Sequence, residues 1–174
     1  ISEAVEFWNR TNKKNYKKII FLETTSTKIH HWQFAIKNKN KDWGAENWQK
    51  LTNALIKDYL VIESVHKETK KNLSVFSPNN MDFRLACAVM NEADLYVGQE
   101  GGFGQVAAAL NKKAVIYFGG WITPEAVGYD FHENIYYENS LSPCGEYKKL
   151  CSHCEEARKE ITVDVFLRHI KKIS

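Results

Sequence analysis

Short runs of apolar residues alternate along the chain with segments in which apolar residues recur every three or four positions. The short runs have no polar side, which is typical of parallel strands that are covered on both faces of a sheet. The segments between them have one apolar and one polar side, which is typical of helices packed on such a sheet. The alternation therefore predicts an α/β fold, with a Rossmann-like parallel sheet and helices on both faces.

The apolar pattern and the turn residues between its segments set the expected boundaries of the elements. We expect strands at residues 19–22, 59–65, 73–77, 94–98, 114–118 and 134–138. We expect helices at residues 1–16, 45–57, 82–93 and 106–110, and a terminal helix with Thr162 as its N-cap. Because the sequence begins with Ile1 rather than methionine, we expect it to be a fragment or a processed product. In a fragment, residues 1–16 would be a linker helix, and residues 17–174 would form one domain.

The stretch from Asp94 to Gly120 organises the rest of the predicted fold. It has the order strand, glycine-rich turn, helix and strand, which is a βαβ unit. Its turn contains Gly101, Gly102 and Gly104. The N–H groups at a helix N-terminus bind anions such as phosphate, because they have no partner within the helix. A phosphate-binding turn is one interpretation, and a turn that serves only the backbone geometry is the other.

Polar residues follow the first predicted strand, at the edge where ligands of open α/β sheets bind. Glu23, Thr24 and Thr25 lie in this loop, and the two hydroxyls can donate to a phosphate or satisfy the loop backbone. Further along, the basic loop 37–41 precedes the next predicted helix. Its last residue, Lys41, is suited as a point charge for a phosphate, although a lysine-rich loop is also typical of a plain solvated surface.

Composition narrows the class of protein without indicating a function. The chain has 174 residues, of which 44% are hydrophobic and 26% charged, so it can form one folded domain and does not resemble a disordered segment. The net charge of +3 suits a domain that binds phosphates but does not require a nucleic-acid partner. No apolar run is long enough for a transmembrane helix, and no signal peptide is recognisable. The four cysteines lack the dense, even spacing of a disulfide scaffold, so we expect a reducing, cytosolic location.

Three of the cysteines are close together near the end of the chain. Cys144, Cys151 and Cys154 offer three thiolates, and His153 or His132 could complete the four ligands of a structural zinc site. The spacing differs from that of standard zinc fingers. Reduced surface thiols, or one disulfide, are the alternatives.

Several motifs occur in an order that is more specific than any one of them. After the first strand come N-K-D-W and a helix with E-N-W, followed by A-D-L-Y-V-G-x-E-G-G-x-x-x-x-A-A-A-L. A strand that ends in F-G-G and a cysteine-bearing tail before I-T-V complete the series. From residue 19 to its end, the chain resembles the C-terminal half of the family 9 glycosyltransferases, which are heptosyltransferase-like enzymes of bacterial surface polysaccharide synthesis.

The resemblance implies a fold and a set of site residues. Enzymes of this family have two Rossmann-like domains in a GT-B arrangement, and residues 17–174 would be the domain that binds the nucleotide-sugar donor. Lys41 would contact the donor phosphates and Glu100 would lie near the donor sugar, so these two are the expected catalytic residues. The donor diphosphate would be held by Thr24, Thr25, Gly101, Gly102, Phe103, Gly104 and Gln105.

The sequence departs from the family pattern in the glycine-rich turn. A histidine of the family is replaced by Gln105, and an aspartate by Glu100. Phe103 and Gly104 also differ from the residues usual there. Because glutamine can donate a hydrogen bond but cannot become a cation, the donor sugar stays open between a heptose and a related sugar.

By resemblance, the expected function is that of the donor-binding domain of an inverting, metal-independent glycosyltransferase. It would move a sugar from a nucleotide diphosphate donor to a surface glycan or lipopolysaccharide acceptor, with the general base supplied by a missing N-terminal domain. No cofactor is required, and the expected location is cytoplasmic, either free or peripheral at the inner membrane. A non-catalytic nucleotide-sugar-binding module is the alternative. An epimerase or phosphorylase of similar architecture would need its own acid/base pair, and none is recognisable.

Overall fold

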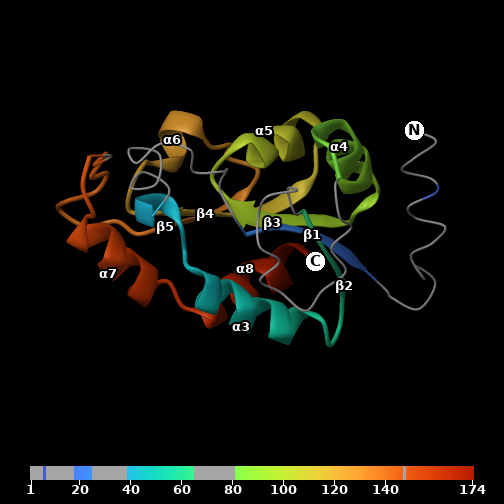
Figure 1. The fold of residues 1–174 in the computed structure, drawn as a ribbon, viewed down its shortest axis with the longest axis horizontal. Helices are drawn as coiled ribbons and strands as arrows, with labels where there is room; N and C mark the ends of the chain where they lie inside the picture. Colours follow the sequence, from blue (N-terminus) through green and yellow to red (C-terminus); the bar gives the residue numbers. More distant parts are fainter. Residues whose placement is uncertain (1–5, 7–17, 25–38, 65–80, 147) are drawn as a thin grey trace.

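The computed structural model describes residues 6, 18–24, 39–64, 81–146 and 148–174 (Figure 1). The predicted linker helix at 1–16, apart from Glu6, lies outside the described residues, as do the predicted strand at 73–77 and Thr25. Strands and helices alternate through the described part of the chain, as the apolar pattern predicts.

Five parallel strands form one sheet in the order β2-β1-β3-β4-β5. Their bounds are Ile19–Glu23 for β1, Leu60–Glu63 for β2, Leu95–Gln99 for β3, Lys113–Gly119 for β4 and Glu133–Tyr136 for β5. Most strand residues are buried, because helices cover both faces of the sheet. The predicted class, a Rossmann-like parallel sheet, is confirmed, and the carboxyl ends of all the strands lie at one edge.

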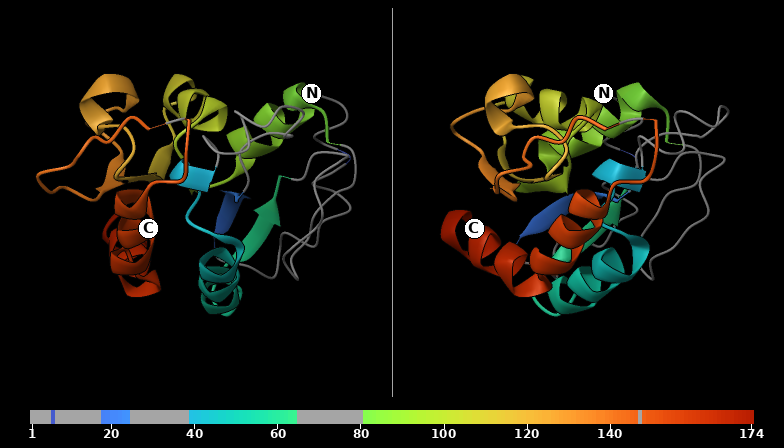
Figure 2. Two further views of the ribbon diagram at one scale, coloured as in Figure 1. Left: turned by 60° about the vertical axis from the view of Figure 1, so that its left-hand side comes forward. Right: turned by 90° about the vertical axis from the view of Figure 1, so that its left-hand side faces the viewer.

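The helices lie in two layers, one on each face of the sheet (Figure 2). One layer contains α4 (Phe83–Glu92), α5 (Gly102–Ala109) and the short α6 (Pro124–Val127). The other contains α3 (Ala45–Leu55), α7 (Ser152–Glu160) and α8 (Val163–Ile173). Within the described ranges, every helix is too short or too polar to cross a membrane.

Each face of the sheet has its own hydrophobic core. The core on the side of α4 and α5 includes Phe21 and Ile116 of the sheet. On the side of α3 and α8, Trp43 is fully buried, and its ring centre lies 4.9 Å from that of Trp48 and 4.2 Å from that of Phe166. Trp43 thereby joins the segment before α3 to the C-terminal helix.

The helices differ from the prediction at the start of α5 and at α6 and α7, which were not predicted. α5 begins at Gly102 rather than at residue 106, so Gly102 and Gly104 belong to the helix and not to a turn before it. Gly104 is buried on β4, where an added Cβ would lie in ordinary contact, 3.4 Å from the Ile116 side chain. The sequence pattern does not predict α7, because this helix is mostly polar and buries only three residues.

Candidate functional site

Two of the predicted site residues meet at the carboxyl edge of the sheet. Residues 39–41 form a helical turn that brings Lys41 to the end of β3, where Glu100 follows the strand. The Lys41 Nζ lies 2.6 Å from the Glu100 Oε2, and the two side chains are only 13% and 16% exposed. The Nζ also lies 5.4 Å from the centre of the Trp121 ring, within the range of a cation–π contact. The two residues expected to be catalytic are therefore in direct contact.

A second carboxyl group, Glu23, ends β1 beside this ion pair. Its Oε2 accepts a hydrogen bond of 2.8 Å from the Tyr96 hydroxyl. Burial raises the pKa of Glu23 from 4.5 to about 7, although the Tyr96 hydrogen bond and the charge of Lys41 act to lower it. Gly98 makes room for this contact, because a Cβ at that position would lie 2.3 Å from the Tyr96 hydroxyl oxygen. Glu23 is therefore about half protonated near neutral pH.

The raised pKa of Glu23 predicts that the stability of the domain falls as the pH rises. Between pH 4.5 and about 7 the unfolded chain has lost this proton while the folded chain keeps it. The free energy of unfolding therefore decreases across this window and is level above it. At about 1.4 kcal/mol per pKa unit, the full decrease is about 3–4 kcal/mol. A Glu23→Gln variant has no proton to lose, and its amide oxygen still accepts the Tyr96 hydrogen bond.

Urea unfolding from about pH 4.5 to about pH 8 measures this difference, and the glutamine variant should gain stability relative to the wild type as the pH rises. Asp130→Asn is the control for the loss of a carboxyl group, since Asp130 is exposed and lies outside β1. If the curves for Glu23→Gln and wild type run parallel, Glu23 does not titrate in this window.

The N-terminus of α5 opens at the same edge. The N–H groups of Gly102–Gly104 have no acceptor within the helix, whereas the Gln105 N–H donates to the Gly101 carbonyl at 3.4 Å. Packing does not require glycine at the start of α5. A Cβ on Gly102 would meet no atom within 4 Å, and one on Gly101 would meet only a backbone carbonyl at 3.9 Å. These two glycines therefore leave the backbone open to a ligand without serving the packing of the fold.

The side chains of the first turn of α5 are held by the protein itself. Gln105 donates through Nε2 to the Val127 carbonyl at 2.8 Å, and its Oε1 accepts from the Tyr129 hydroxyl at 2.7 Å. The Phe103 ring packs 5.6 Å from the ring of Phe21, so this residue offers a ligand its backbone N–H. The hollow between this turn and the end of α6 measures only about 10 Å³. A ligand here would therefore rest on an open surface.

The Thr24 hydroxyl points to the neighbouring strand. It donates to the Glu63 Oε1 at 2.9 Å, and both residues are buried. Because its proton is used in this way, the Thr24 hydroxyl can offer a ligand an oxygen lone pair but no hydrogen. Sequence analysis missed Glu63, whose signal is a single charge at the end of an apolar strand.

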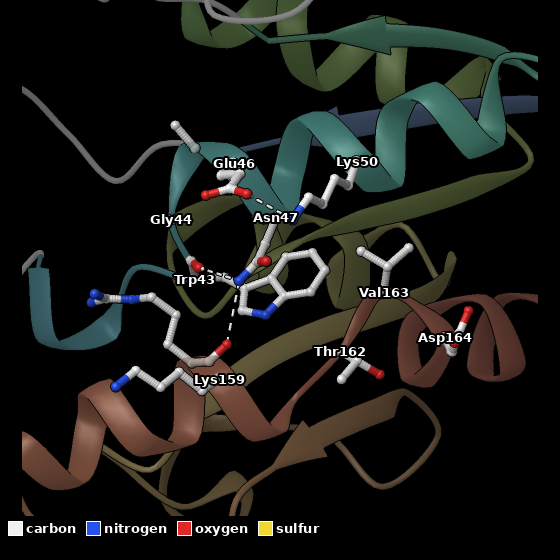
Figure 3. Close-up of a pocket in the computed structure, with 11 residues that line it drawn as sticks. Trp43, Gly44, Glu46, Asn47, Lys50, Lys159, Thr162, Val163 and Asp164 are labelled. Carbon is white, nitrogen blue, oxygen red and sulfur yellow. Dashed lines mark hydrogen bonds and ion pairs between the residues drawn. The ribbon is translucent and has the colours of Figure 1, made fainter.

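A larger cavity, of about 570 Å³, lies between α3 and the junction of α7 and α8 (Figure 3). It is lined by charges of both signs, and Lys50 at its rim pairs with Glu46 at 2.7 Å. No described residue that we predicted to bind or act on a ligand lines this cavity. We therefore place the candidate site at the carboxyl edge, where the predicted residues converge.

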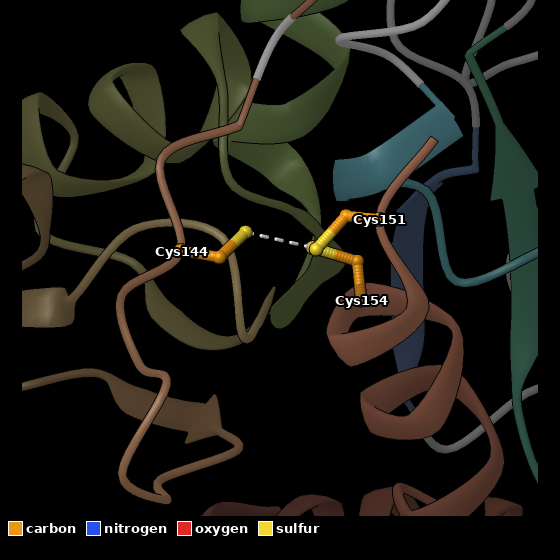
Figure 4. A group of neighbouring side chains, drawn as sticks. All are labelled: Cys144, Cys151 and Cys154. Atoms are coloured by element: carbon orange, nitrogen blue, oxygen red, sulfur yellow. Dashed lines mark hydrogen bonds between the residues drawn. The ribbon is translucent and has the colours of Figure 1, made fainter. Parts of the chain in front are cut away.

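The clustered cysteines form a compact group beside α7 (Figure 4). The sulfurs of Cys144, Cys151 and Cys154 all lie within 4.8 Å of one another, and those of Cys144 and Cys154 are 3.1 Å apart. Burial acts to raise the pKa of Cys151, but the N–H groups at the start of α7 and the neighbouring thiols lower it below its usual value. Three thiols at these distances can bind a metal ion.

The two histidines considered as a fourth ligand lie elsewhere. The His153 Nε2 is 2.9 Å from the Ser142 hydroxyl oxygen, and the His132 ring packs against Tyr129 and Phe131. In the part of the chain that the structure describes, the ligand group consists of the three sulfurs alone. All three cysteines are free thiols.

A scan against protein-family models and a search of the curated proteins find no match to this chain. Solved structures match it in fold. The family 9 glycosyltransferase of Veillonella parvula has a TM-score of 0.66 at 14% identity, with 99% of this chain and 50% of that chain covered. The E. coli ADP-heptose lipopolysaccharide heptosyltransferase II has a TM-score of 0.64 at 13% identity, with 99% of this chain and 51% of that chain covered. TibC, an iron-containing dodecameric glycosyltransferase of enterotoxigenic E. coli, has a TM-score of 0.65 at 14% identity, with 90% of this chain and 46% of that chain covered.

The chain spans about half the length of the structures that it matches. Sequence identity of this order establishes similarity of fold and not of activity. The fold that the sequence motifs predict by resemblance is confirmed, since the matched structures are those of heptosyltransferases and a family 9 glycosyltransferase. The chain has the fold of one half, a single Rossmann-like domain, of a family 9 glycosyltransferase of the heptosyltransferase type.

Proposed function

We propose that this chain is the donor-binding half of an inverting glycosyltransferase that uses a nucleoside diphosphate sugar. The observation that carries the proposal is the convergence of Lys41, Glu100 and the open N-terminus of α5 at one edge of the sheet. The cation and the helix N-terminus provide positive charge for a diphosphate, and the carboxylate can accept hydrogen bonds from sugar hydroxyls. Solved structures of similar fold support the proposal, since one heptosyltransferase contains ADP and another contains ADP-heptose.

The chemistry required of this half is stabilisation of the leaving group. As the bond between the sugar and the diphosphate breaks, negative charge develops on the diphosphate oxygens. Lys41 neutralises this charge directly, and the N–H groups of residues 102–104 do so as oriented dipoles. Glu100 holds the sugar through its hydroxyls. Proton removal from the acceptor hydroxyl needs a general base, which we assign to the other half of the protein.

The replacement of the family histidine by Gln105 affects which donor the site accepts. Gln105 is neutral and its amide is already bonded to residues near α6, so among the described residues at this edge Lys41 brings the positive side-chain charge to Glu100. We propose a heptose or a related sugar as the group transferred, and a surface glycan or lipopolysaccharide as the acceptor. Such a reaction would take place in the cytoplasm or at the inner face of the membrane.

A transfer assay on the protein that joins this chain to its acceptor-binding half tests the proposal. We expect release of the nucleoside diphosphate to depend on the acceptor, and the new glycosidic bond to have the opposite anomeric configuration to the donor, as read by NMR. Retention of configuration would contradict an inverting mechanism. Donor binding without transfer or donor hydrolysis would favour the alternative, a non-catalytic nucleotide-sugar-binding module.

We also propose that Cys144, Cys151 and Cys154 hold one structural metal ion. Tetrahedral coordination with metal–sulfur bonds of about 2.3 Å places the sulfurs about 3.8 Å apart. The sulfur distances here, from 3.1 Å to 4.8 Å at most, bracket that value. Zinc and iron both accept thiolate ligands, and one structure of similar fold is that of an iron-containing enzyme. The ion would fix the segment after Cys144 to the start of α7 and would take no part in transfer.

Elemental analysis tests this assignment. The chain purified without chelator should contain about one equivalent of zinc or iron. Cys154→Ser should abolish most of this metal and lower the melting temperature, because it removes a buried ligand. Cys87→Ser is the control, since Cys87 lies on α4, outside the thiol group, and its replacement should leave the metal in place. Wild-type protein without metal, purified under reducing conditions, would rule out the proposed ion.

A further inference from the structure

The helical turn at residues 39–41 is held by the C-terminal part of the chain through the side chain of Asn40. This side chain is buried, with 2% exposed, and its Nδ2 donates to two backbone carbonyls at 2.7 Å and 2.9 Å. Its Oδ1 accepts from the Cys151 N–H at 3.1 Å. All three partners belong to the segment that we call the thiol loop, residues 144–146 and 148–151.

One carbonyl of the thiol loop is bonded to groups on two sides of Lys41. The Glu146 oxygen accepts from the Asn40 Nδ2 at 2.7 Å and from the Trp121 Nε1 at 3.1 Å. Asn40 precedes Lys41 in the chain, and the Trp121 ring faces the Lys41 ammonium at 5.4 Å. The turn that carries Lys41 and the ring that faces its charge are therefore both hydrogen-bonded to the Glu146 carbonyl oxygen.

The thiol loop is itself fixed near its beginning and at its end. The Cys144 N–H donates to the Gly120 carbonyl at 3.1 Å, and the Gly145 N–H donates to the Trp121 carbonyl at 3.0 Å. The sulfurs of Cys144 and Cys151, at its two ends, lie within 4.8 Å of each other. These backbone hydrogen bonds, and the closeness of the two ends of the loop, limit where the Glu146 oxygen can lie.

We propose that Asn40 is a positioning residue that couples the thiol loop to Lys41 and so sets the affinity of the site for the donor diphosphate. The inference rests on the proposed function, because it assigns a support to the lysine that would bind the diphosphate. A lysine side chain loses rotational freedom when it binds a phosphate, and a support that orders it beforehand reduces this loss. Asn40 does not contact the ligand, and its effect passes through Lys41.

Binding of ADP, GDP, UDP and CDP to this chain, measured by isothermal titration calorimetry, tests the coupling. Asn40→Ala is expected to weaken the tightest of the four about tenfold, because a less well placed Lys41 makes a poorer charged hydrogen bond to the diphosphate. Asn47→Ala is the matched control, because its Nδ2 donates to the Trp43 and Arg158 carbonyls at 3.0 Å and 3.3 Å, outside the thiol loop. This control should destabilise the domain while changing the affinity less than about twofold.

A double-mutant cycle separates positioning from general destabilisation. In the Lys41→Ala background, Asn40→Ala should cause no further loss of affinity, since its effect passes through Lys41. An equal loss in both backgrounds would overturn the proposal. Trp121→Phe serves if Asn40→Ala does not fold. It keeps an aromatic ring near Lys41, removes the donor to the Glu146 carbonyl, and should weaken binding about twofold to threefold.

The possible failures can be told apart. If the wild-type chain binds none of the four nucleoside diphosphates, the proposed function fails and the coupling fails with it. If the wild type binds and Lys41→Ala weakens binding, but Asn40→Ala and Trp121→Phe both bind as the wild type does, only the coupling is wrong.

Discussion

Replacing Lys41 by alanine is expected to weaken the binding of a nucleoside diphosphate by up to about 100-fold. A hydrogen bond that involves a charged group contributes about 1.5–3 kcal/mol, and about 1.4 kcal/mol corresponds to a factor of ten. The loss should lie at the upper end of this range, because the Glu100 carboxylate now 2.6 Å from Lys41 would then face the diphosphate without its partner. Turnover of the protein with both halves should fall by a similar factor.

Lys50→Ala is the matched control for this prediction. Lys50 also pairs with a glutamate, Glu46, at 2.7 Å, but it lies on α3 and is 60% exposed. Its removal should leave nucleotide affinity unchanged, since surface ion pairs of this kind contribute little. Adding Glu100→Gln to Lys41→Ala should restore part of the affinity by removing the unpaired charge. Wild-type affinity in Lys41→Ala would remove this residue from the site.

Replacing Trp43 by alanine is expected to destabilise the domain by about 3–5 kcal/mol, the usual cost of truncating a buried tryptophan. The ring is fully buried and packs against Trp48 and Phe166 in the core between α3, α8 and the sheet. Its Nε1–H also donates to the Ile161 carbonyl at 2.7 Å, so truncation leaves a buried acceptor without a donor. The cavity and the unpaired carbonyl both lower the free energy of unfolding.

Thermal unfolding followed by far-UV circular dichroism measures the effect. A loss of this size should lower the melting temperature by about 10 °C in a domain of this length. Trp43→Phe keeps most of the apolar area and loses the hydrogen bond, so its effect should be smaller, about 1–2 kcal/mol. Leu150→Ala, at a position 55% exposed, should stay within about 0.5 kcal/mol of the wild type. A loss below about 1 kcal/mol in Trp43→Ala would contradict the packing role described here.

The architecture was predictable because most residues of β1, β2, β3 and β4 are buried between the two helix layers, which leaves apolar runs in the sequence. The glycine-rich segment was predictable as a connection between strands, because it lies between the apolar runs at residues 94–98 and 114–118. The predicted start of α5, residue 106, lies four residues after the observed start at Gly102, because Gly102 and Gly104 disfavour a helix by propensity. α7 leaves no apolar period in the sequence, so it was not predicted.

The site was predictable as a set of residues but not as a set of contacts. Lys41 and Glu100 were both named from the sequence, and their contact follows from the placement of the turn at 39–41 beside the end of β3. The Tyr96 bond to Glu23 joins residues 73 positions apart, and its formation depends on β1 lying next to β3. Such a neighbour relation comes from the strand order, which the sequence alone does not specify.

The most direct test of the central claim is a thermal-shift titration of this chain with ADP, GDP, UDP, CDP and their common sugar conjugates. A ligand at about 100 times its dissociation constant stabilises the folded state by about 2.7 kcal/mol, which raises the melting temperature of a domain of this length by about 5–10 °C. We predict such a shift with one nucleoside diphosphate and its sugar conjugate, and its loss in Lys41→Ala. Cooperative melting at an unchanged temperature with all of these ligands would contradict the assignment of a donor site to this edge of the sheet.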